Sequence, residues 1–186
     1  MKLFFKTYGY DALKMFLNQF ATAIFGVSLA LAASSAQNPV LRNVTSIGAI
    51  LFYLFLLYTM TWDIGFRDKV SVESGKRKKD SYLGAKISLL ANLPNFIFAI
   101  LIALATLFNS SALSAMGAFG SGGALILEGM YTGLLANHVG GAALNSQFWV
   151  YFLLPIPAIV ICGVAYRMGQ MDIKIFKSRA SGKGRD

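Results

Sequence analysis

Four apolar runs alternate with polar segments along the 186-residue chain, at about 12–33, 44–62, 83–108 and 148–166. Each run has roughly the 20 helical residues needed to cross a hydrocarbon core of about 30 Å. Hydrophobic residues make up 56% of the chain and charged residues only 13%, against about 25% charged residues in soluble domains. The pattern predicts an all-α integral membrane protein with four transmembrane helices, in which residues 1–173 form one membrane domain.

The first apolar run follows Lys2, Lys6 and Lys14 and ends in the small polar residues Ser34-Ser35-Ala36-Gln37. This arrangement resembles a secretory signal peptide with a small-residue cleavage site. The apolar stretch is nevertheless long enough to span a bilayer, and we therefore expect it to be retained as the first helix.

The basic residues are distributed unevenly between the polar segments. Sixteen of the 17 Lys and Arg residues lie within 2–14, 67–86 and 167–185, and the exception is Arg42. Cytoplasmic loops of membrane proteins carry an excess of Lys and Arg. We therefore expect a multi-pass protein of the cell membrane with both termini in the cytoplasm and the loops 34–43 and 109–147 outside.

The net charge of +9 bears on the partners of the protein. In a soluble protein it would suggest nucleic acid. Here the basic residues flank membrane spans, where anionic lipid headgroups attract them. We expect the lipid bilayer and anionic headgroups on the cytoplasmic face as partners, and no nucleic acid. The basic tail 174–186 is rich in Ser, Gly, Lys and Arg, and this composition predicts disorder.

The second outer loop, 109–147, is long and has no Lys or Arg. It opens with the Gly, Ser and Ala-rich stretch Asn109 to Gly123, and a helical pattern follows at about 124–137. That helix is too short to span, so it is either interfacial or re-entrant and is expected to cap the bundle. Pro155 and Pro157 are expected to distort the start of the fourth helix.

Two motifs near the ends of the second and fourth runs have the same spacing, Trp62-x-x-Gly65-x-x-Asp68 and Tyr166-x-x-Gly169-x-x-Asp172. Two helical hairpins in the same orientation would form a parallel repeat, related by an axis along the membrane normal. Aromatic residues also favour membrane interfaces and glycine favours helix ends, so convergence explains the motifs equally well. Both explanations stay open, and the six motif residues are candidates for docking a partner on the cytoplasmic face.

Polar residues inside a span are the default functional candidates in a membrane protein, because lipid cannot satisfy them. Asn18 and Gln19 lie in the first run, and Asn92 and Asn95 lie at a similar depth in the third, where Pro94 predicts a kink. Together they are candidates for a substrate site or polar path on the cytoplasmic half. Hydrogen bonding between helices is the alternative explanation.

Glu128 is the only acidic residue of the outer loops and His138 is the only histidine of the chain. On one helix they would make outer-face candidates for metal binding or proton movement, but two ligands are an incomplete zinc site. Solvent-facing residues are the alternative. The single Cys162 excludes an internal disulfide. We therefore expect no metal, no cofactor and no enzymatic activity.

A ribbon of small residues follows one face of the first helix at four-residue spacing: Thr22, Gly26, Ala30 and Ser34. Such spacing lets another helix approach closely. The leading hypothesis is a non-enzymatic protein that acts through assembly, as a membrane subunit of a larger complex or as a homo-oligomer. The alternative is a small transporter or channel with a polar path near Asn18, Asn92 and Asn95.

Overall fold

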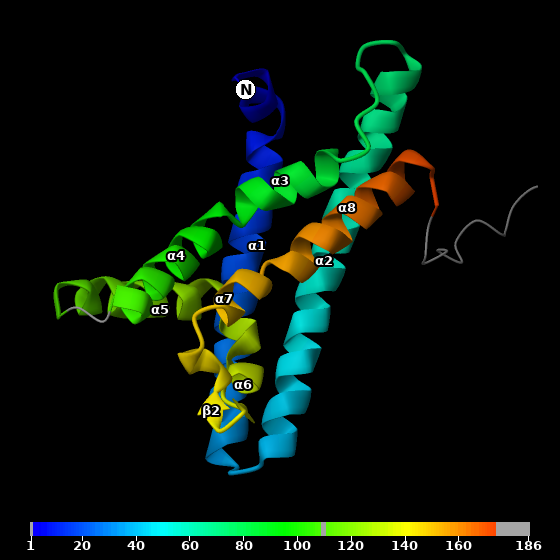
Figure 1. Cartoon of the computed structure of the whole chain (residues 1–186). Helices are drawn as coiled ribbons and strands as arrows, with labels where there is room; N and C mark the ends of the chain where they lie inside the picture. The colour runs from blue at the N-terminus through cyan, green and yellow to red at the C-terminus, as the bar shows by residue number, and fades with distance from the viewer. Residues whose placement is uncertain (1, 109–110, 174–186) are drawn as a thin grey trace, which may run out of the picture.

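The computed structural model describes residues 2–108 and 111–173, so the predicted disordered tail lies outside the described residues. Two long helices, α1 (Lys2–Ser35) and α2 (Pro39–Glu73), lie side by side and form an antiparallel pair (Figure 1). The turn between them is capped by Asn38, whose side-chain oxygen accepts the backbone N–H groups of Val40 and Leu41 at 3.0 and 3.1 Å. These donors have no partner within the helix, and the cap therefore fixes where α2 begins.

The remaining elements pack against this pair. In chain order they are α3 (Leu83–Ala91), α4 (Leu93–Phe108), α5 (Ser111–Leu127), η1 (Gly129–Tyr131), α6 (Thr132–Leu135), β1 (His138–Val139), β2 (Ala142–Ala143), η2 (Leu144–Ser146), α7 (Val150–Leu153) and α8 (Ile156–Gln170). The two strands form an antiparallel ladder in which His138 pairs with Ala143.

Three segments of the described chain are long and apolar enough to cross a membrane: α1, α2 and the stretch Val150–Gln170. The pair α3 and α4 passes the same test as a fourth span, with a bend of 53° between the two helices. The protein is a multi-pass helical membrane protein, and the predicted fold class is confirmed. The helix α2 continues past the predicted end of its apolar run to Glu73, because charged residues such as Lys, Arg and Glu are good helix formers.

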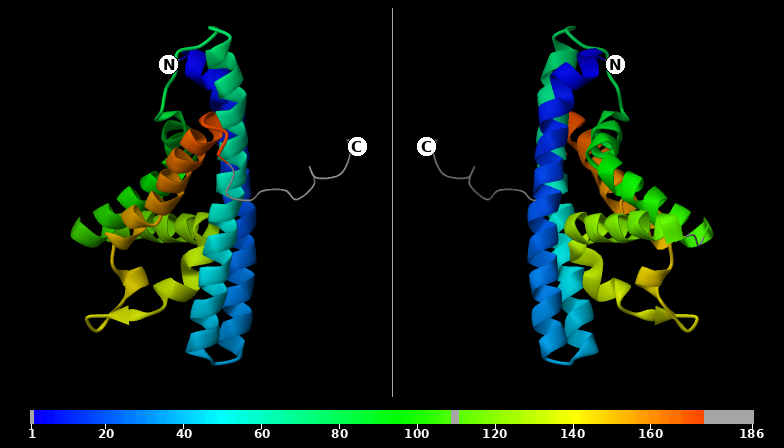
Figure 2. Two further views of the ribbon diagram at one scale, coloured as in Figure 1. Left: turned by 90° about the vertical axis from the view of Figure 1, so that its right-hand side faces the viewer. Right: turned by 90° about the vertical axis from the view of Figure 1, so that its left-hand side faces the viewer.

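The segment expected to be a Gly, Ser and Ala-rich loop is largely a helix, α5, which forms a hairpin with α4. The small residues allow close packing: a Cβ added at Gly123 would lie 2.4 Å from the ring of Phe98, and one at Gly117 would lie 2.6 Å from Ala105 Cβ. At 17 residues, α5 is shorter than a span. Figure 2 shows the α4–α5 hairpin projecting sideways from the α1–α2 pair.

The two repeated glycine motifs meet each other where α2 crosses α8. A Cβ added at Gly65 would lie 2.2 Å from the carbonyl oxygen of Tyr166, and one at Gly169 would lie 2.2 Å from the carbonyl oxygen of Trp62. Each glycine therefore admits the backbone of the other helix beside the aromatic residue of the other motif. The contacts are reciprocal, as a two-fold relation between the helices would make them. Duplication of the hairpin stays a prediction.

The short helix α6 lies against the start of α2. The Gly133 N–H donates to Ser46 Oγ at 2.9 Å, and Asn137 Nδ2 donates to Asn43 Oδ1 at 2.8 Å. Arg42, the basic residue outside the three basic stretches, donates from Nη2 to Asn137 Oδ1 at 3.3 Å. The Arg42 side chain thus helps to hold α6 and the following turn against α2.

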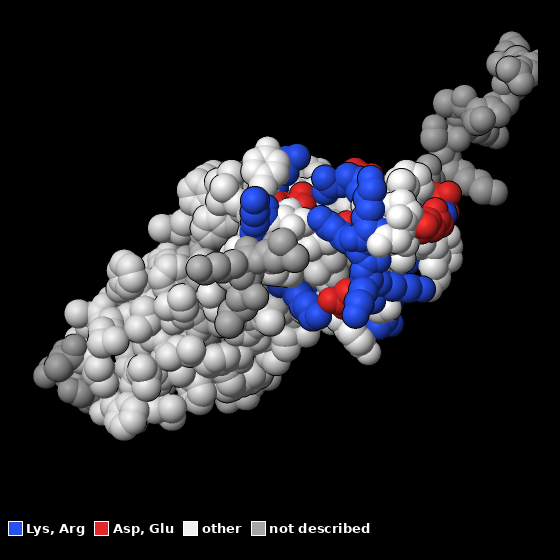
Figure 3. Space-filling view, turned by 90° about the horizontal axis from the view of Figure 1, so that it is seen from above, with Lys and Arg blue, Asp and Glu red and all other residues white. Residues whose placement is uncertain are grey.

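Basic side chains gather at the end of the molecule where α1 begins and α2 ends (Figure 3). We call this the charged end; its basic residues include Lys6, Arg67, Lys69, Arg77 and Arg167. The α4–α5 hairpin extends away from it, and neither helix contains a charged residue. The hydrophobic core lies between α1, α2, α3 and α8, where Met15, Leu57 and Ile87 are fully buried.

Candidate functional site

Three helix breaks occur in the part of the chain that packs against α1 and α2. Asn92 lies between α3 and α4, Glu128 lies between α5 and η1, and Pro155 lies between α7 and α8. Pro94 and Pro155 have no N–H to donate to a preceding turn, which favours the first and third of these breaks. Irregular backbone at membrane depth is tolerated only where protein or water satisfies it. These breaks therefore mark the places to search for a site.

The break at Asn92 is held by side-chain hydrogen bonds. Asn92 Nδ2 donates to the carbonyl oxygen of Ser88 at 2.9 Å, and Asn92 Oδ1 accepts from Asn95 Nδ2 at 3.0 Å. The side chain of Asn92 also interacts with the hydroxyl of Tyr53 on α2. Asn95 Oδ1 is buried without a hydrogen-bond partner among the described residues. The bend between α3 and α4 thus brings polar atoms into the interior and leaves one unsatisfied.

Gln19 connects α1 to the end of α5. Its Nε2 donates to the carbonyl oxygen of Leu127 at 3.0 Å. A helix leaves its last carbonyl groups without a partner inside the helix, and this bond satisfies one of them. The side chain is 2% exposed, and its Oε1 is buried without a partner among the described residues. Gln19 therefore has unused hydrogen-bonding capacity next to Glu128.

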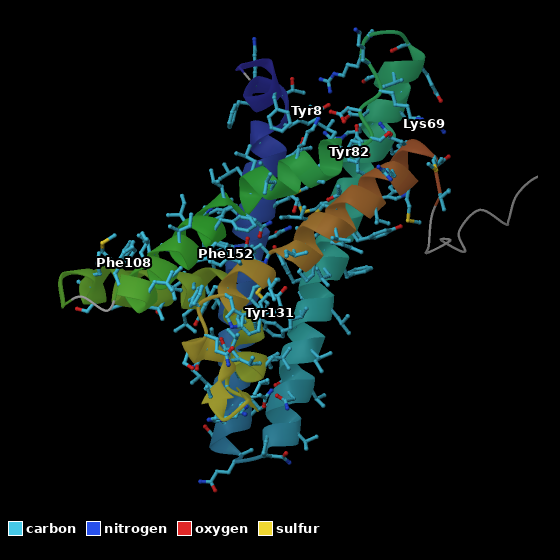
Figure 4. The ribbon with its side chains drawn as sticks, in the orientation of Figure 1. Tyr8, Lys69, Tyr82, Phe108, Tyr131 and Phe152 are labelled. Carbon is cyan, nitrogen blue, oxygen red and sulfur yellow. The ribbon has the colours of Figure 1, made fainter. Side chains whose placement is uncertain are left out.

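Glu128 is 3% exposed, and its Oε1 is buried without a hydrogen-bond partner in residues 2–108 and 111–173. Three tyrosines, Tyr53, Tyr131 and Tyr151, lie within electrostatic range of it. Figure 4 shows Tyr131 in the middle of the molecule, far from Phe108 at the tip of α4. Burying a carboxyl group without a partner is costly, and acidic residues in membrane segments usually serve function.

Glu128 lines a cavity of about 250 Å³ between α5, α6, η2 and α7. We call it the Glu128 cavity. Its other polar residues are Ser121, Thr132, Asn145 and Tyr151, and its apolar residues are Ala124, Leu125, Leu135 and Ala136. The Tyr151 hydroxyl donates to the backbone oxygen of Asn145 at 3.0 Å. The cavity therefore joins a buried acid to neutral oxygen-bearing groups.

The structure brings some of the predicted polar-path residues near this acid and not others. Gln19 contacts the residue before Glu128, and Asn92 reaches it through Tyr53. Asn18 instead donates from Nδ2 to the sulfur of Met60 on α2. Its side chain is therefore engaged at the contact between α1 and α2.

The two outer-face candidates are separated. The predicted single helix breaks at Glu128 and ends at Leu135, so that Glu128 is buried while His138 is exposed in β1. The reason is that α5 returns to α1 and buries its last turn there. No group of three His, Cys, Asp or Glu residues that would hold a metal ion occurs within the described part of the chain.

The sequence did not indicate that these tyrosines belong to the site, because Tyr53 and Tyr151 lie in apolar segments where aromatic residues normally pack. An acid inside an otherwise apolar stretch, Leu125 to Tyr131, was the one signal that pointed to Glu128. It does not reveal burial, because burial depends on contacts with α1 and α7.

Asp68, one of the docking candidates, is the centre of a second polar cluster at the charged end. Its Oδ2 accepts the hydroxyl groups of Tyr8 and Tyr166 at 2.8 and 2.9 Å, and its Oδ1 lies 3.1 Å from Arg77 Nη1. Arg77 also donates to the Tyr8 hydroxyl. We call these four residues the Asp68 network. It ties α1, α2, α8 and the loop after α2 together.

The other docking candidates lie around this network. Trp62 Nε1 donates to the carbonyl oxygen of Ile173 at 2.7 Å, and its ring stacks on Phe66. Gly65 and Gly169 form the helix crossing, and Asp172 is exposed with a φ of 56°. Docking of a partner on these residues stays a prediction.

The small-residue ribbon of α1 faces the interior along most of its length. Thr22 and Ala30 are buried, and Ser34 is exposed near the end of the helix. A Cβ added at Gly26 would lie 2.3 Å from the Cα of Met130, so η1 occupies this part of the ribbon. The close approach that the spacing predicts is thus made to an element of the same chain.

The chain matches no protein-family model, no curated protein and no solved structure.

Proposed function

We propose that this membrane protein is a small transporter, and that a polar solute binds in the Glu128 cavity on its way across the bilayer. The observation that carries the proposal is the buried residue Glu128, whose Oε1 has no hydrogen-bond partner among the described residues and which lines a cavity beside a break between two helices. Transporter sites are typically formed by broken helices near the middle of the membrane. No catalytic step is part of this function.

The surrounding groups support a path rather than a closed structural contact. Gln19 Oε1, Asn95 Oδ1 and the Tyr131 hydroxyl are all buried without a partner among the described residues. Buried polar groups in folded proteins normally have partners, so several unsatisfied atoms in the interior indicate places for water or a solute. The path proposed here includes Gln19, Asn92 and Asn95, and has Glu128 at its centre.

Access to the cavity from both sides of the membrane tests transport. Thr132→Cys, made in a Cys162→Ala background, introduces one thiol into the cavity lining. A membrane-impermeant methanethiosulfonate is then added to either side of oriented vesicles. We expect labelling from both sides, because a transporter exposes its site to each side in turn. Labelling from one side only would exclude a path through this cavity.

Two control variants define the background of this assay. Leu51→Cys places a thiol on the outward face of α2, at a position that is 61% exposed in the isolated chain and expected to contact lipid. It should stay unlabelled from both sides. Ser74→Cys lies at the charged end and Ser146→Cys lies beyond the β-ladder, so each should react from one side and the two from opposite sides.

We further propose that the charged end faces the cytoplasm, with both termini on that side and anionic headgroups against its basic residues. The charge distribution supports this orientation. The Ser74→Cys and Ser146→Cys variants test it directly in vesicles of known orientation. If Ser74→Cys reacted with reagent added on the outside, the charged end would face outward, and the proposed orientation would be wrong.

Assembly with a membrane partner or a second copy is the second candidate function, and the α4–α5 hairpin favours it. The hairpin projects from the α1–α2 pair and presents large apolar side chains, among them Phe119 at 68% exposed and Phe108 at 67%. We expect the protein to self-associate through this hairpin. Mass measurement in mild detergent tests it, and a monomer with no co-purifying partner would contradict it.

A further inference from the structure

We propose that the ligand of the Glu128 cavity is a small organic cation with an ammonium group. This inference rests on the proposed function for the role of the cavity, and on the lining residues for the chemistry of the ligand.

The charges of the residues that line the cavity indicate the charge of its ligand. Of the nine residues that line the cavity, Glu128 is the single ionisable acid, and none is Lys, Arg or His. Once ionised, the Glu128 carboxyl group would repel an anionic ligand and would lack a counter-charge beside a neutral one. A cation pairs it. Pairing matters most where water is excluded, because the attraction between charges grows as the effective dielectric constant falls.

The neutral groups of the lining suit an ammonium ion. An ammonium group has up to three N–H donors and no acceptor. Thr132 and Ser121 supply hydroxyl oxygens and Asn145 supplies an amide oxygen. The Tyr151 hydroxyl already donates its proton to the backbone oxygen of Asn145, so the lone pairs of that hydroxyl stay available. Its ring adds an aromatic face of the kind that attracts cations.

Cavity size and ligand number separate an organic cation from a metal ion. The volume of about 250 Å³ exceeds the space that one water or one bare ion occupies, and it lies below the range of drug-sized ligands. Calcium and magnesium ions take about six or more oxygen ligands, and a zinc site takes about three or four ligands from His, Cys, Asp and Glu. The cavity has one carboxylate. An alkylammonium of a few carbon atoms fits both its volume and its mixed polar and apolar lining.

The experiment measures thermal unfolding of the purified full-length protein in mild detergent. The probes are ethylammonium chloride and tetramethylammonium chloride. Sodium chloride at equal ionic strength controls for salt, and ethanol controls for a neutral molecule of similar size. We expect the ammonium salts to raise the Tm by about 5–10 °C when each is present at a hundredfold excess over its Kd. Sodium chloride and ethanol should leave the Tm unchanged.

Variants of the cavity locate the effect. Glu128→Gln keeps the side-chain size and removes the charge, so we expect it to lose the Tm shift, whereas Glu128→Asp should retain part of it. Ser28→Ala, on the outer surface of α1, should keep the full shift. A second measurement uses the wild type alone: dicyclohexylcarbodiimide should modify Glu128, and ethylammonium should slow that modification severalfold. This readout does not depend on the folding of any variant.

The outcomes separate this inference from the proposed transport. Protection by ammonium ions, combined with labelling of Thr132→Cys from one side only, would support the ligand class and refute transport. Labelling from both sides without any ammonium effect on Tm or on carbodiimide modification would overturn the ligand class and leave transport standing. Equal protection by sodium chloride and ammonium salts would also overturn it.

Discussion

The crossing of α2 and α8 makes a quantitative prediction about Gly65. In Gly65→Ala the new Cβ would lie 2.2 Å from the carbonyl oxygen of Tyr166, and ordinary contact begins at 3.4 Å. The helices must therefore separate by roughly 1 Å, and the obstructing atom is backbone, which does not rotate away. Overpacking of this kind costs about 1–3 kcal/mol. Because the obstructing atom belongs to the backbone, we take the cost of overpacking as about 3 kcal/mol. The higher helix propensity of alanine offsets about 1 kcal/mol of this cost.

The net loss of about 2 kcal/mol corresponds to a decrease in Tm of about 4–8 °C for a protein of this length. Thermal unfolding in detergent, followed by tryptophan fluorescence, measures it, since Trp62 lies at the crossing. Gly163→Ala on α8 is the matched control, because its Cβ would lie 3.5 Å from Ala85 Cβ, an ordinary contact. We expect that control to be neutral or slightly stabilising.

The reciprocal geometry adds a second test. One outward shift of α8 relieves the contacts at both Gly65 and Gly169, so the double alanine variant should lose at least about 1 kcal/mol less than the sum of the single variants. Equal Tm values for Gly65→Ala and Gly163→Ala, or strictly additive losses in the double variant, would refute the reasoning, because neither agrees with close contact at the two glycines.

Two further variants test polar contacts by the same unfolding measurement. Tyr166→Phe removes one hydroxyl group from the buried carboxylate of Asp68 and should cost about 1.5–3 kcal/mol; Tyr10→Phe, at an exposed position, should cost nothing measurable, and equal effects would contradict the role of the network. Ser46→Ala leaves the Gly133 N–H without its acceptor and should cost about 1–3 kcal/mol. An unchanged Tm in Ser46→Ala would mean that α6 is not held by this bond.

The spans were predictable because their signal is local. The length of each apolar run decides whether a helix can cross, and the predicted runs coincide with α1, α2, the α3–α4 pair and the α7–α8 stretch. Gln19 and Asn92 were also recognisable, since polar residues stand out in an apolar run. Both side chains are buried in the structure, where protein rather than lipid surrounds their polar groups.

The helix α5 and the burial of Glu128 were not predictable in the same way. Gly, Ser and Ala between Ser111 and Gly123 indicate a loop by composition, and they form a helix because α4 accepts their small surfaces. The position of Glu128 then follows from where that helix ends against α1, through the bond from Gln19 to Leu127. Both facts depend on contacts between segments that are distant in the sequence. The residue pattern of a single segment does not reveal such contacts.

The Asp68 network has a consequence for the synthesis of the chain. Tyr8 and Tyr166 stand 60 and 98 residues from the aspartate that accepts both of their hydroxyl groups. The first hairpin can make its bond to Asp68 early, whereas the bond from the last helix forms only when nearly the whole membrane domain has been translated and inserted. Until then the carboxylate lacks one of its donors. Insertion of α8 and closure of the charged end are therefore the same event.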